Sequence, residues 1–273
     1  GMIKKIENGQ IIVTGRNPEG DLELEYADSL GTKKPATIWN SVSHSASEHG
    51  SSFIKNVLPG RKFTYPKSLY AVHDAIRFIT KEKKDAIIVD FFAGSGTTLH
   101  AVNLLNAEDN GHRRCIMVTN NEVSADESKA LLKQGIKPGD EEWNKLGIAR
   151  HVTWPRTVCS IEGHDINNNS LKGNYIGCDI PMSDGFKANA AFFKLVFLDK
   201  TSVALGRQFK ELLPVLWMKG GAIGKCPTVD EGDLPNMLIL PINKMAILID
   251  ELYYPEFDEP VSYTHLRAHE TLR

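Results

Sequence analysis

The sequence predicts an α/β protein in which strands alternate with helices in a layered sheet. Apolar runs of strand length, such as DAIIVDFF and RRCIMVTNNE, alternate with longer stretches whose apolar residues recur every three or four positions. A glycine-rich turn, GSGTT, joins DAIIVDFF directly to the helical pattern TTLHAVNLLNAED. Strand, turn, helix and the next strand therefore form one β-loop-α-β unit.

The composition is that of a globular protein of one or two domains. The chain has 273 residues, a formal net charge of -2, 41% hydrophobic residues and 24% charged residues. This charge balance excludes a strongly basic nucleic-acid-binding protein but leaves room for a local basic groove. No apolar stretch approaches the roughly 20 residues of a membrane helix, so no membrane contact is expected. Four scattered cysteines without a C-x-x-C pair favour the reducing cytoplasm.

Residues 1–60 are predicted to hold a β-rich segment followed by a loop. QIIVTG and LELEY have strand character and flank the turn sequence NPEG. The stretch TIWNSVSHSASEHGSSF is rich in Ser, His and Gly and is predicted as a loop. His44 and His49 have no Cys or carboxylate partner at a metal-ligand spacing, so they are interpreted as polar loop residues and no metal site is expected.

The stretch TYPKSLYAVHDAIRFITKEK is predicted as an amphipathic helix. Pro66 lies where a helix can begin, and Ser68 is a residue type that caps helix N-termini. The apolar face of this helix is formed by residues at helical spacing: Leu69, Val72, Ile76 and Ile79.

Further elements are expected after the β-loop-α-β unit. DESKALLKQG and EEWNKLGIARHV are predicted as helices, and TVCSIEGHDINNNSLKGNYIG as a hairpin excursion. Residues 191–199 are predicted as a strand, and GRQFKELLPVLWMKGGA as a helix that Pro214 kinks or restarts. MLILP and KMAILIDELYY are predicted as strands, whereas VSYTHLRAHETLR has no clear period. The aromatic residues assigned to the core are Phe192, Phe193, Phe197 and Trp217.

Two phosphate-binding interpretations of VDFFAGSGTT fail on single positions. A phosphate-binding loop of the form G-x-x-x-x-G-K-[ST] needs a Lys where Thr97 stands. A dinucleotide fingerprint, G-x-G-x-x-G, needs a third glycine where the bulky Leu99 stands. A tight turn without any ligand remains an alternative.

A third interpretation is an S-adenosylmethionine loop, with the pattern acid-x-Phe-x-Gly-x-Gly. Its glycines let the backbone pass close to the ligand without a Cβ clash. The ligand is a sulfonium without phosphate, so no Lys is needed. An acid after the next strand is placed to bind ribose hydroxyls, and Glu122 follows CIMVTNN. The four matching positions are Asp90, Phe92, Gly94 and Gly96.

The stretch DFFAGSGTTLHAVNLLN resembles motif I of the amino-directed DNA methyltransferases, which modify the exocyclic nitrogen of adenine or cytosine. FTYPKSLYAVHDAIRFIT, just before it, is similar to their motif X. This order is the permuted "beta" order, and the resemblance is strongest to the Mod subunits of type III restriction-modification systems. It implies a Rossmann-like sheet with helices on both faces over residues 61–258. Residues 1–60 would end a target-recognition region, and residues 259–273 would be a non-native tail.

The resemblance also assigns site residues. Lys67 and Ser68 from motif X would close over S-adenosylmethionine, although a plain helix start is the alternative reading. Glu122 would hold the ribose, with Asn120 and Asn121 as alternatives. The methionine end of the cofactor would be lined by one continuous stretch: Asp90, Phe91, Phe92, Ala93, Gly94, Ser95, Gly96 and Thr97.

The catalytic half of the site is missing from the printed sequence. The family accepts protons from the target amine through an Asp/Asn/Ser-Pro-Pro-aromatic loop, whose aromatic residue stacks on the flipped base. YPKS, LPINK and YYPEF are the nearest strings, and none is this loop. The expected chain is therefore a C-terminal part of a bacterial DNA methyltransferase, adenine-directed by its type III character, that binds cofactor but lacks a catalytic residue. Duplex DNA and either a restriction subunit or a second copy are the implied partners. The alternatives are a non-catalytic degenerate domain and a nucleotide-dependent oxidoreductase.

Overall fold

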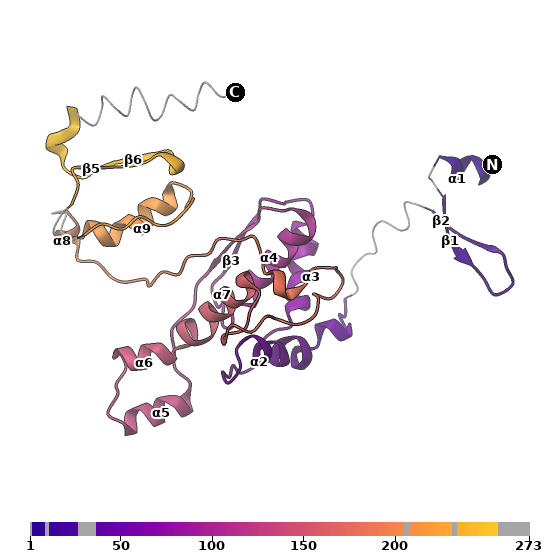
Figure 1. Cartoon of the computed structure of the whole chain (residues 1–273), viewed down its shortest axis with the longest axis horizontal. Helices are drawn as coiled ribbons and strands as arrows, with labels where there is room; N and C mark the ends of the chain where they lie inside the picture. Colours follow the sequence, from indigo (N-terminus) through magenta and orange to yellow (C-terminus); the bar gives the residue numbers. More distant parts are fainter. Residues whose placement is uncertain (1, 9–10, 27–36, 205–207, 231–233, 256–273) are drawn as a thin grey trace. The chain divides into compact units, whose positions relative to one another are not determined.

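The computed structural model describes residues 2–8, 11–26, 37–204, 208–230 and 234–255 (Figure 1). The chain divides into two compact units, Gly1–Phe192 and Phe193–Arg273. The predicted α/β class is confirmed as a mixture of helices and strands, but the described strands form three separate two-stranded sheets. The domain limits at residues 60 and 258 stay predictions, and residues 259–273 lie outside the described part.

A β-hairpin lies near the start of the described chain, as predicted. It follows the short helix α1 (Met2–Glu7) and pairs β1 (Ile11–Arg16) with β2 (Leu22–Tyr26) in antiparallel register. The side chain of Asn17 closes the turn, because its Oδ1 accepts hydrogen bonds from the backbone amides of Glu19 and Asp21.

The predicted β-loop-α-β unit is confirmed at the centre of the first unit. β3 (Ile87–Asp90) lies parallel to β4 (Arg114–Met117), and helix α4 (Thr97–Asp109) connects them. Helix α3 (Leu69–Thr80) packs against α4. Ser68 caps α3 as predicted, since its Oγ accepts a hydrogen bond from the Ala71 amide.

The core of this unit lies between the helices. Ile79 is exposed, so its assignment to the apolar face of α3 was wrong, whereas Leu69 is fully buried. The buried apolar residues come from helix α2 (Phe53–Val57) and the residue after it, from α3 and α4, from helix α7 (Trp154–Glu162), and from the turns before and after α7. They are Phe53, Val57, Leu58, Leu69, Tyr70, Ala101, Leu104, Val152, Cys159, Leu171, Tyr175 and Phe186.

The stretch predicted as a loop, TIWNSVSHSASEHGSSF, is largely helical. A single turn at Val42–His44 and a π-helical segment at Ser47–Ser52 lead into α2 (Phe53–Val57). The loop prediction was wrong because Ser and Gly weaken helix propensity only slightly, and tertiary packing overrides it. The packing residues lie at helical spacing just beyond the Ser-rich part: Phe53, Ile54, Val57 and Leu58.

The predicted hairpin excursion is helical in its first six residues, which belong to α7. Helices α5 (Ala125–Lys133) and α6 (Glu141–Leu146) were predicted, and a π-helical turn at Ala149–Thr153 then leads into α7 (Trp154–Glu162). Gly163 ends α7 with a positive φ of 76°. The turn residues after it form only isolated bridges, His164 to Ser170 and Asn174 to Pro181, and one turn at Met182–Asp184.

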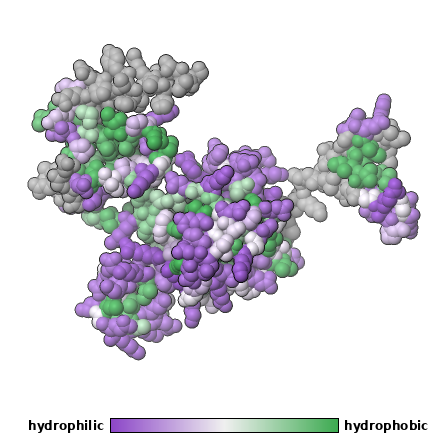
Figure 2. Space-filling model, in the orientation of Figure 1, coloured by the Kyte–Doolittle hydropathy of each residue, from purple (hydrophilic) through white to green (hydrophobic). Residues whose placement is uncertain are grey.

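The second unit holds two helices and a hairpin. Its helices are α8 (Lys200–Ala204) and α9 (Phe209–Lys219), and α9 continues through Pro214. The predicted strands appear as an antiparallel pair, β5 (Met237–Leu240) and β6 (Met245–Leu248). Short 3₁₀ turns at Pro241–Asn243 and Glu251–Tyr253 flank β6. Figure 2 shows hydrophobic side chains at the surface of this unit.

The prediction of a strand at residues 191–199 was wrong. The segment has no regular structure up to the start of α8 at Lys200. Phe197 is 97% exposed, and Phe192 and Phe193 are each 41% exposed, so the assignment of these three residues to the core was wrong too. Trp217 is buried as predicted. An apolar run of strand length forms a strand only where a partner strand supplies hydrogen bonds.

A buried arginine joins the far ends of the central helices. Arg113, just before β4, donates from Nε to Thr80 Oγ1 at 3.0 Å and from Nη2 to the Thr80 carbonyl oxygen at 2.8 Å. Nη1 and Nη2 each donate to a carboxylate oxygen of Asp109 at 2.9 Å. These bonds hold the pKa of Asp109 below its usual value. The last residue of α3, the last residue of α4 and the start of β4 are thereby tied together.

One face of the β3–β4 pair is uncovered. Val89 and Ile116 are paired in the register and point to the same face, where each keeps about half of its surface exposed. Ile87 and Val118 extend this apolar face and are also exposed. Parallel strands are normally covered on both faces. The predicted sheet with helices on both faces is therefore not seen among the described strands.

Candidate cofactor site

The glycine loop between β3 and α4 is held by its own acid. Asp90 Oδ1 accepts a hydrogen bond from the Phe92 amide at 3.0 Å, and Asp90 Oδ2 accepts one from Thr98 Oγ1 at 2.5 Å. Gly94 and Gly96 have φ values of 49° and 78°, in the left-handed region where glycine is favoured. The loop thus turns tightly and opens α4 at Thr97.

Two residues that the sequence did not single out pack against the glycines. A Cβ on Gly94 would lie 3.1 Å from the Phe63 ring, and a Cβ on Gly96 would lie 3.3 Å from the Thr153 methyl group. Thr153 Oγ1 also donates to the Gly94 carbonyl oxygen. Phe63 begins the motif X-like stretch but was not assigned a role there, and no motif marks Thr153, which only the fold brings to the loop.

The side chains of Ser95 and Thr97 lie behind the loop. Both are buried, and their hydroxyl oxygens are 3.1 Å apart. The buried guanidinium of Arg156 in α7 donates to both of them. Ala93 is also buried, and its amide donates to the Val118 carbonyl oxygen. A ligand in front of the loop would therefore meet backbone groups at these positions rather than hydroxyls.

Several aromatic side chains in and near the loop are exposed to solvent. Phe92 is 91% exposed, and Phe91 next to it is also exposed. Phe63 brings the preceding segment to Gly94, and Tyr65 in that segment is 87% exposed. Tyr65 has a positive φ of 59°, which is uncommon for a bulky residue. Flat apolar surfaces of this kind suit a nucleoside base.

The two predicted residues of motif X differ in their surroundings. Ser68 is buried, and its hydroxyl both caps α3 and donates to the Ser43 carbonyl oxygen at 2.7 Å. Lys67 is exposed. Gly50 packs against this segment so closely that a Cβ there would lie 2.5 Å from the Pro66 carbonyl oxygen. The Ser68 hydroxyl is therefore occupied by hydrogen bonds within the protein, whereas the Lys67 side chain is accessible to solvent.

The predicted ribose residues follow β4. Glu122 is exposed, and its carbonyl oxygen accepts a hydrogen bond from the Ile148 amide at 2.9 Å. Asn121 donates to the Asn144 carbonyl oxygen and accepts from the Arg150 amide, which commits its side chain to the α6 region. Asn120 is exposed. Glu122 and Asn120 thus keep accessible side chains, and Asn121 does not.

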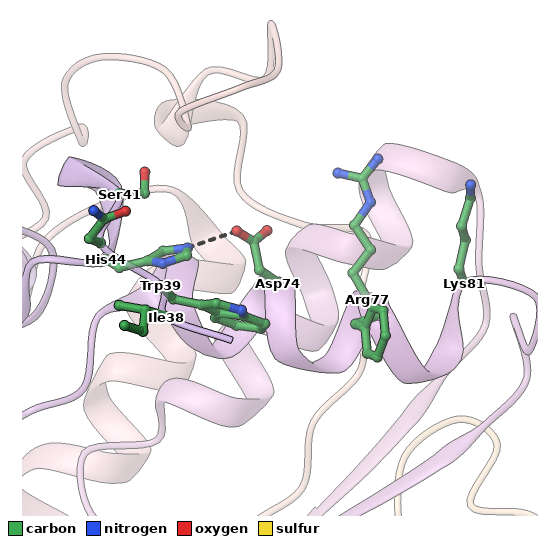
Figure 3. A pocket seen from close by; sticks show the side chains of 9 residues that line it. Ile38, Trp39, Ser41, His44, Asp74, Arg77 and Lys81 are labelled. Atoms are coloured by element: carbon green, nitrogen blue, oxygen red, sulfur yellow. Dashed lines mark hydrogen bonds and ion pairs between the residues drawn. The ribbon is translucent and has the colours of Figure 1, made fainter. Parts of the chain in front are cut away.

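A cavity of about 430 Å³ lies away from the loop, beside the outer face of α3 (Figure 3). Among the lining residues, His44 Nε2 lies 2.8 Å from Asp74 Oδ2, so the His44 side chain has a hydrogen-bond partner in α3 and is not only a polar loop residue. None of the predicted cofactor residues lines this cavity. Within the described ranges, no three His, Cys, Asp or Glu side chains gather as a metal site requires. The lining residues are Ile38, Trp39, Asn40, Ser41, His44, Asp74, Arg77, Phe78 and Lys81.

The acid-ended strand and the two left-handed glycines define a tight turn from β3 into α4, and exposed aromatic side chains lie in and beside this turn. Residues 19–183, more than half of the chain, match the N6_N4_Mtase family, described as DNA methylase. The chain belongs to this family of DNA methylases. No helix in the described ranges is both long and apolar enough to cross a membrane.

Relatives share the region of the loop. The chain is 42% identical over 94 residues to the type III restriction-modification enzyme EcoPI Mod subunit of Escherichia phage P1, which covers 34% of this chain and 14% of that protein. It is 38% identical over 96 residues to the type II methyltransferase M.KpnI of Klebsiella pneumoniae, a match that covers 35% of this chain and 22% of that protein. It is 32% identical over 117 residues to the type III restriction-modification enzyme StyLTI Mod subunit of Salmonella typhimurium, a match that covers 42% of this chain and 17% of that protein. Each match thus spans less than a quarter of the relative.

Proposed function

We propose that this chain carries the S-adenosylmethionine-binding part of a DNA methyltransferase that methylates the exocyclic amine of adenine. The loop from Asp90 to Thr98 carries this proposal, because its conformation is fixed by internal hydrogen bonds while its front stays open. Family membership and the printed names of the relatives support methyl transfer to DNA. The type III Mod relatives favour adenine over cytosine and add a restriction subunit as a candidate partner.

The residues present fit S-adenosylmethionine. When bound, this cofactor supplies a methyl group on a positively charged sulfur. Gly94 and Gly96 would let the ligand approach the loop backbone, and no Lys stands at the position that a phosphate ligand would require. The exposed side chains of Phe91 and Phe92 would line the methionine end of the cofactor, and Glu122 would accept hydrogen bonds from ribose hydroxyls. Lys67 would close over the cofactor from the start of α3.

We further propose that methyl transfer needs a catalytic segment that the printed sequence does not contain. No Pro-Pro-aromatic loop occurs in the chain, so none of its residues is assigned to accept the amine protons. The uncovered face of β3–β4 supports this, since Val89 and Ile116 offer apolar surface where further elements of a Rossmann-like sheet would pack. Residues 1–60 would then belong to a target-recognition region that contacts duplex DNA.

Calorimetric titration with S-adenosylmethionine and S-adenosylhomocysteine tests cofactor binding. We expect both to bind and NAD not to bind. Gly94→Val should abolish binding, because a side chain there would meet the Phe63 ring and strain the left-handed backbone. Gly173→Val, at a left-handed glycine with open space around it, is the matched control and should leave binding unchanged. Absence of binding by the unmodified chain would contradict the proposal.

A methylation assay with duplex DNA and a labelled methyl donor tests the missing catalytic segment. The chain alone should transfer no label. Turnover by the chain alone would contradict the proposal of a missing catalytic segment, but it would not contradict the proposal that the chain binds the cofactor.

A further inference from the structure

The cavity of about 430 Å³ beside α3 has its own two walls, and no residue of the glycine loop belongs to them. One wall comes from the outer face of α3 and from Lys81 just after the helix. The other comes from the segment between Ile38 and His44. Cavities of about 300–1,000 Å³ are typical of small-molecule sites. This cavity therefore has room for a ligand separate from one at the glycine loop.

Two positive charges line the wall that α3 provides. Figure 3 shows Arg77 and Lys81 following Asp74 along the helix, and the spacing of four residues places the two cations on one face. Both side chains are exposed, and neither forms an ion pair with a carboxylate in the described part of the chain. An arginine and a lysine in this arrangement attract an anion, and a guanidinium can bind a phosphate through two hydrogen bonds.

The acidic group in the lining, the carboxylate of Asp74, already has a partner for each of its oxygens. Oδ2 lies 2.8 Å from His44 Nε2, and Oδ1 lies 3.1 Å from His73 Nδ1. His73 Nε2 lies in turn 3.0 Å from Glu108 Oε2 in α4, which fixes this wall from behind. Because the carboxylate oxygens are engaged within the protein, the cavity favours an anionic ligand over a cationic one.

Aromatic surface completes the lining. Trp39 and Phe78 are both exposed, and the indole of Trp39 packs beside the imidazole of His44 with the ring centroids 5.4 Å apart. Nucleobases of any kind stack on aromatic side chains. A bare inorganic anion would leave these rings unused, and an apolar molecule would remove water from Arg77 and Lys81 without replacing it. The ligand that suits the whole lining carries both a flat ring and a negative charge.

We propose that this cavity is a second ligand site that binds a nucleotide, with the base against Trp39 and Phe78 and the phosphate at Arg77 and Lys81. The same chemistry is offered by a free nucleotide and by an unpaired nucleotide of a DNA strand, so the experiment separates these two sources. The inference does not depend on the proposed function, because no residue that lines the cavity is assigned to S-adenosylmethionine.

Calorimetric titration with deoxyadenosine monophosphate, deoxyadenosine and inorganic phosphate tests the site. The monophosphate should bind at least about tenfold more tightly than either of its parts, because its base and its phosphate contact different groups in the lining. A short deoxyadenosine oligonucleotide identifies the source: tighter binding than the monophosphate assigns the site to a DNA strand, and equal binding assigns it to free nucleotide. An excess of S-adenosylhomocysteine should not displace the monophosphate, since the glycine loop does not line the cavity.

Variants at exposed positions assign the binding to this cavity. Arg77→Gln and Lys81→Gln should each weaken monophosphate binding about three- to tenfold, and Trp39→Leu about tenfold. Arg150→Gln, the same change at an exposed arginine outside the cavity, should leave the affinity unchanged.

Three results would overturn the inference: no binding of the monophosphate or the oligonucleotide, unchanged affinity in all three cavity variants, or displacement of the monophosphate by S-adenosylhomocysteine. None of them bears on whether the chain binds S-adenosylhomocysteine. Failure of the unmodified chain to bind S-adenosylhomocysteine would contradict the proposed function and leave the nucleotide site standing.

Discussion

Asp90 and Thr98 face each other across the glycine loop, and the Thr98 hydroxyl donates to Asp90 Oδ2 at 2.5 Å. The other carboxylate oxygen of Asp90 accepts from the Phe92 amide. The acid that the sequence marks as a cofactor residue thus ties the end of β3 to both the loop and the first turn of α4. Its first role in the structure is to hold the loop.

Asp90→Asn should lower the free energy of unfolding by about 1–3 kcal/mol, because an amide cannot accept on both sides of the loop. Thr98→Val removes only one of the two bonds and should cost about 0.5–1.5 kcal/mol. Urea unfolding measures both values, with Asp85→Asn at an exposed position as the control. A large loss of cofactor affinity in Asp90→Asn without any loss of stability would instead indicate direct ligand contact.

Ser68 and Lys67 are neighbours with different expected roles. Ser68→Ala should cost about 1 kcal/mol of stability, because the cap of α3 is lost. Lys67→Ala should change stability by no more than about 0.5 kcal/mol and should weaken S-adenosylhomocysteine binding. Thermal unfolding and calorimetric titration of both variants separate the two roles. Unchanged stability in Ser68→Ala would show that its hydroxyl bonds do not support the helix.

His73 should make stability depend on pH. Burial lowers the pKa of His73, but hydrogen bonds and charge from Glu108 and Asp74 outweigh it and raise the pKa above 6.5. A pKa raised in the folded state contributes stability that is fully present below the unfolded value and is lost as pH rises through the folded value. His73→Gln should therefore lose more stability at about pH 6 than at about pH 8, as measured by urea unfolding. An equal loss of stability at both pH values would contradict a contribution from the ion pairs of His73 with Glu108 and Asp74.

The uncovered face of β3–β4 should make the isolated chain associate with itself. Val89→Thr and Ile116→Thr replace half-exposed apolar side chains, so they should reduce association at little cost in stability. Light scattering against protein concentration measures the change. Ile79→Thr, an equally apolar but isolated exposed position on α3, is the control and should not reduce association. Unchanged association in Val89→Thr and Ile116→Thr would show that the chain does not associate through this face.

The sequence predicted the β-loop-α-β unit well because its signals are local. Continuous apolar runs indicate β3 and β4, recurring apolar residues indicate α3 and α4, and two glycines mark the turn. Helices α2 and α7 were missed because Ser, Gly and Asn in their neighbourhood resemble turn chemistry, while the packing that stabilises the helices is not local. The prediction of a strand at residues 191–199 was wrong for the opposite reason. Apolar character can be read from neighbouring residues, but a strand also needs a partner strand from elsewhere in the chain.

The structure separates the predicted site residues into exposed and buried ones. Pattern matching found the loop, but it could not separate residues that face a ligand from residues that support the loop, such as Ser95 and Thr97. It also missed Arg156, since an arginine within WPRTVC carries no signal that its side chain is buried. Such assignments depend on the direction of each side chain, which only the packed fold supplies.

Arg113 anchors one end of α4, and the glycine loop begins the other. The anchored end is bonded to Thr80 and Asp109, so it moves with α3 and β4 as a block. The loop end depends on Asp90 and on two neighbouring residues, Thr153 and Arg156, at the start of α7. The two ends of α4 are therefore held by separate sets of hydrogen bonds, so a change at the loop can leave intact the bonds of Arg113 that tie α3, α4 and β4 together.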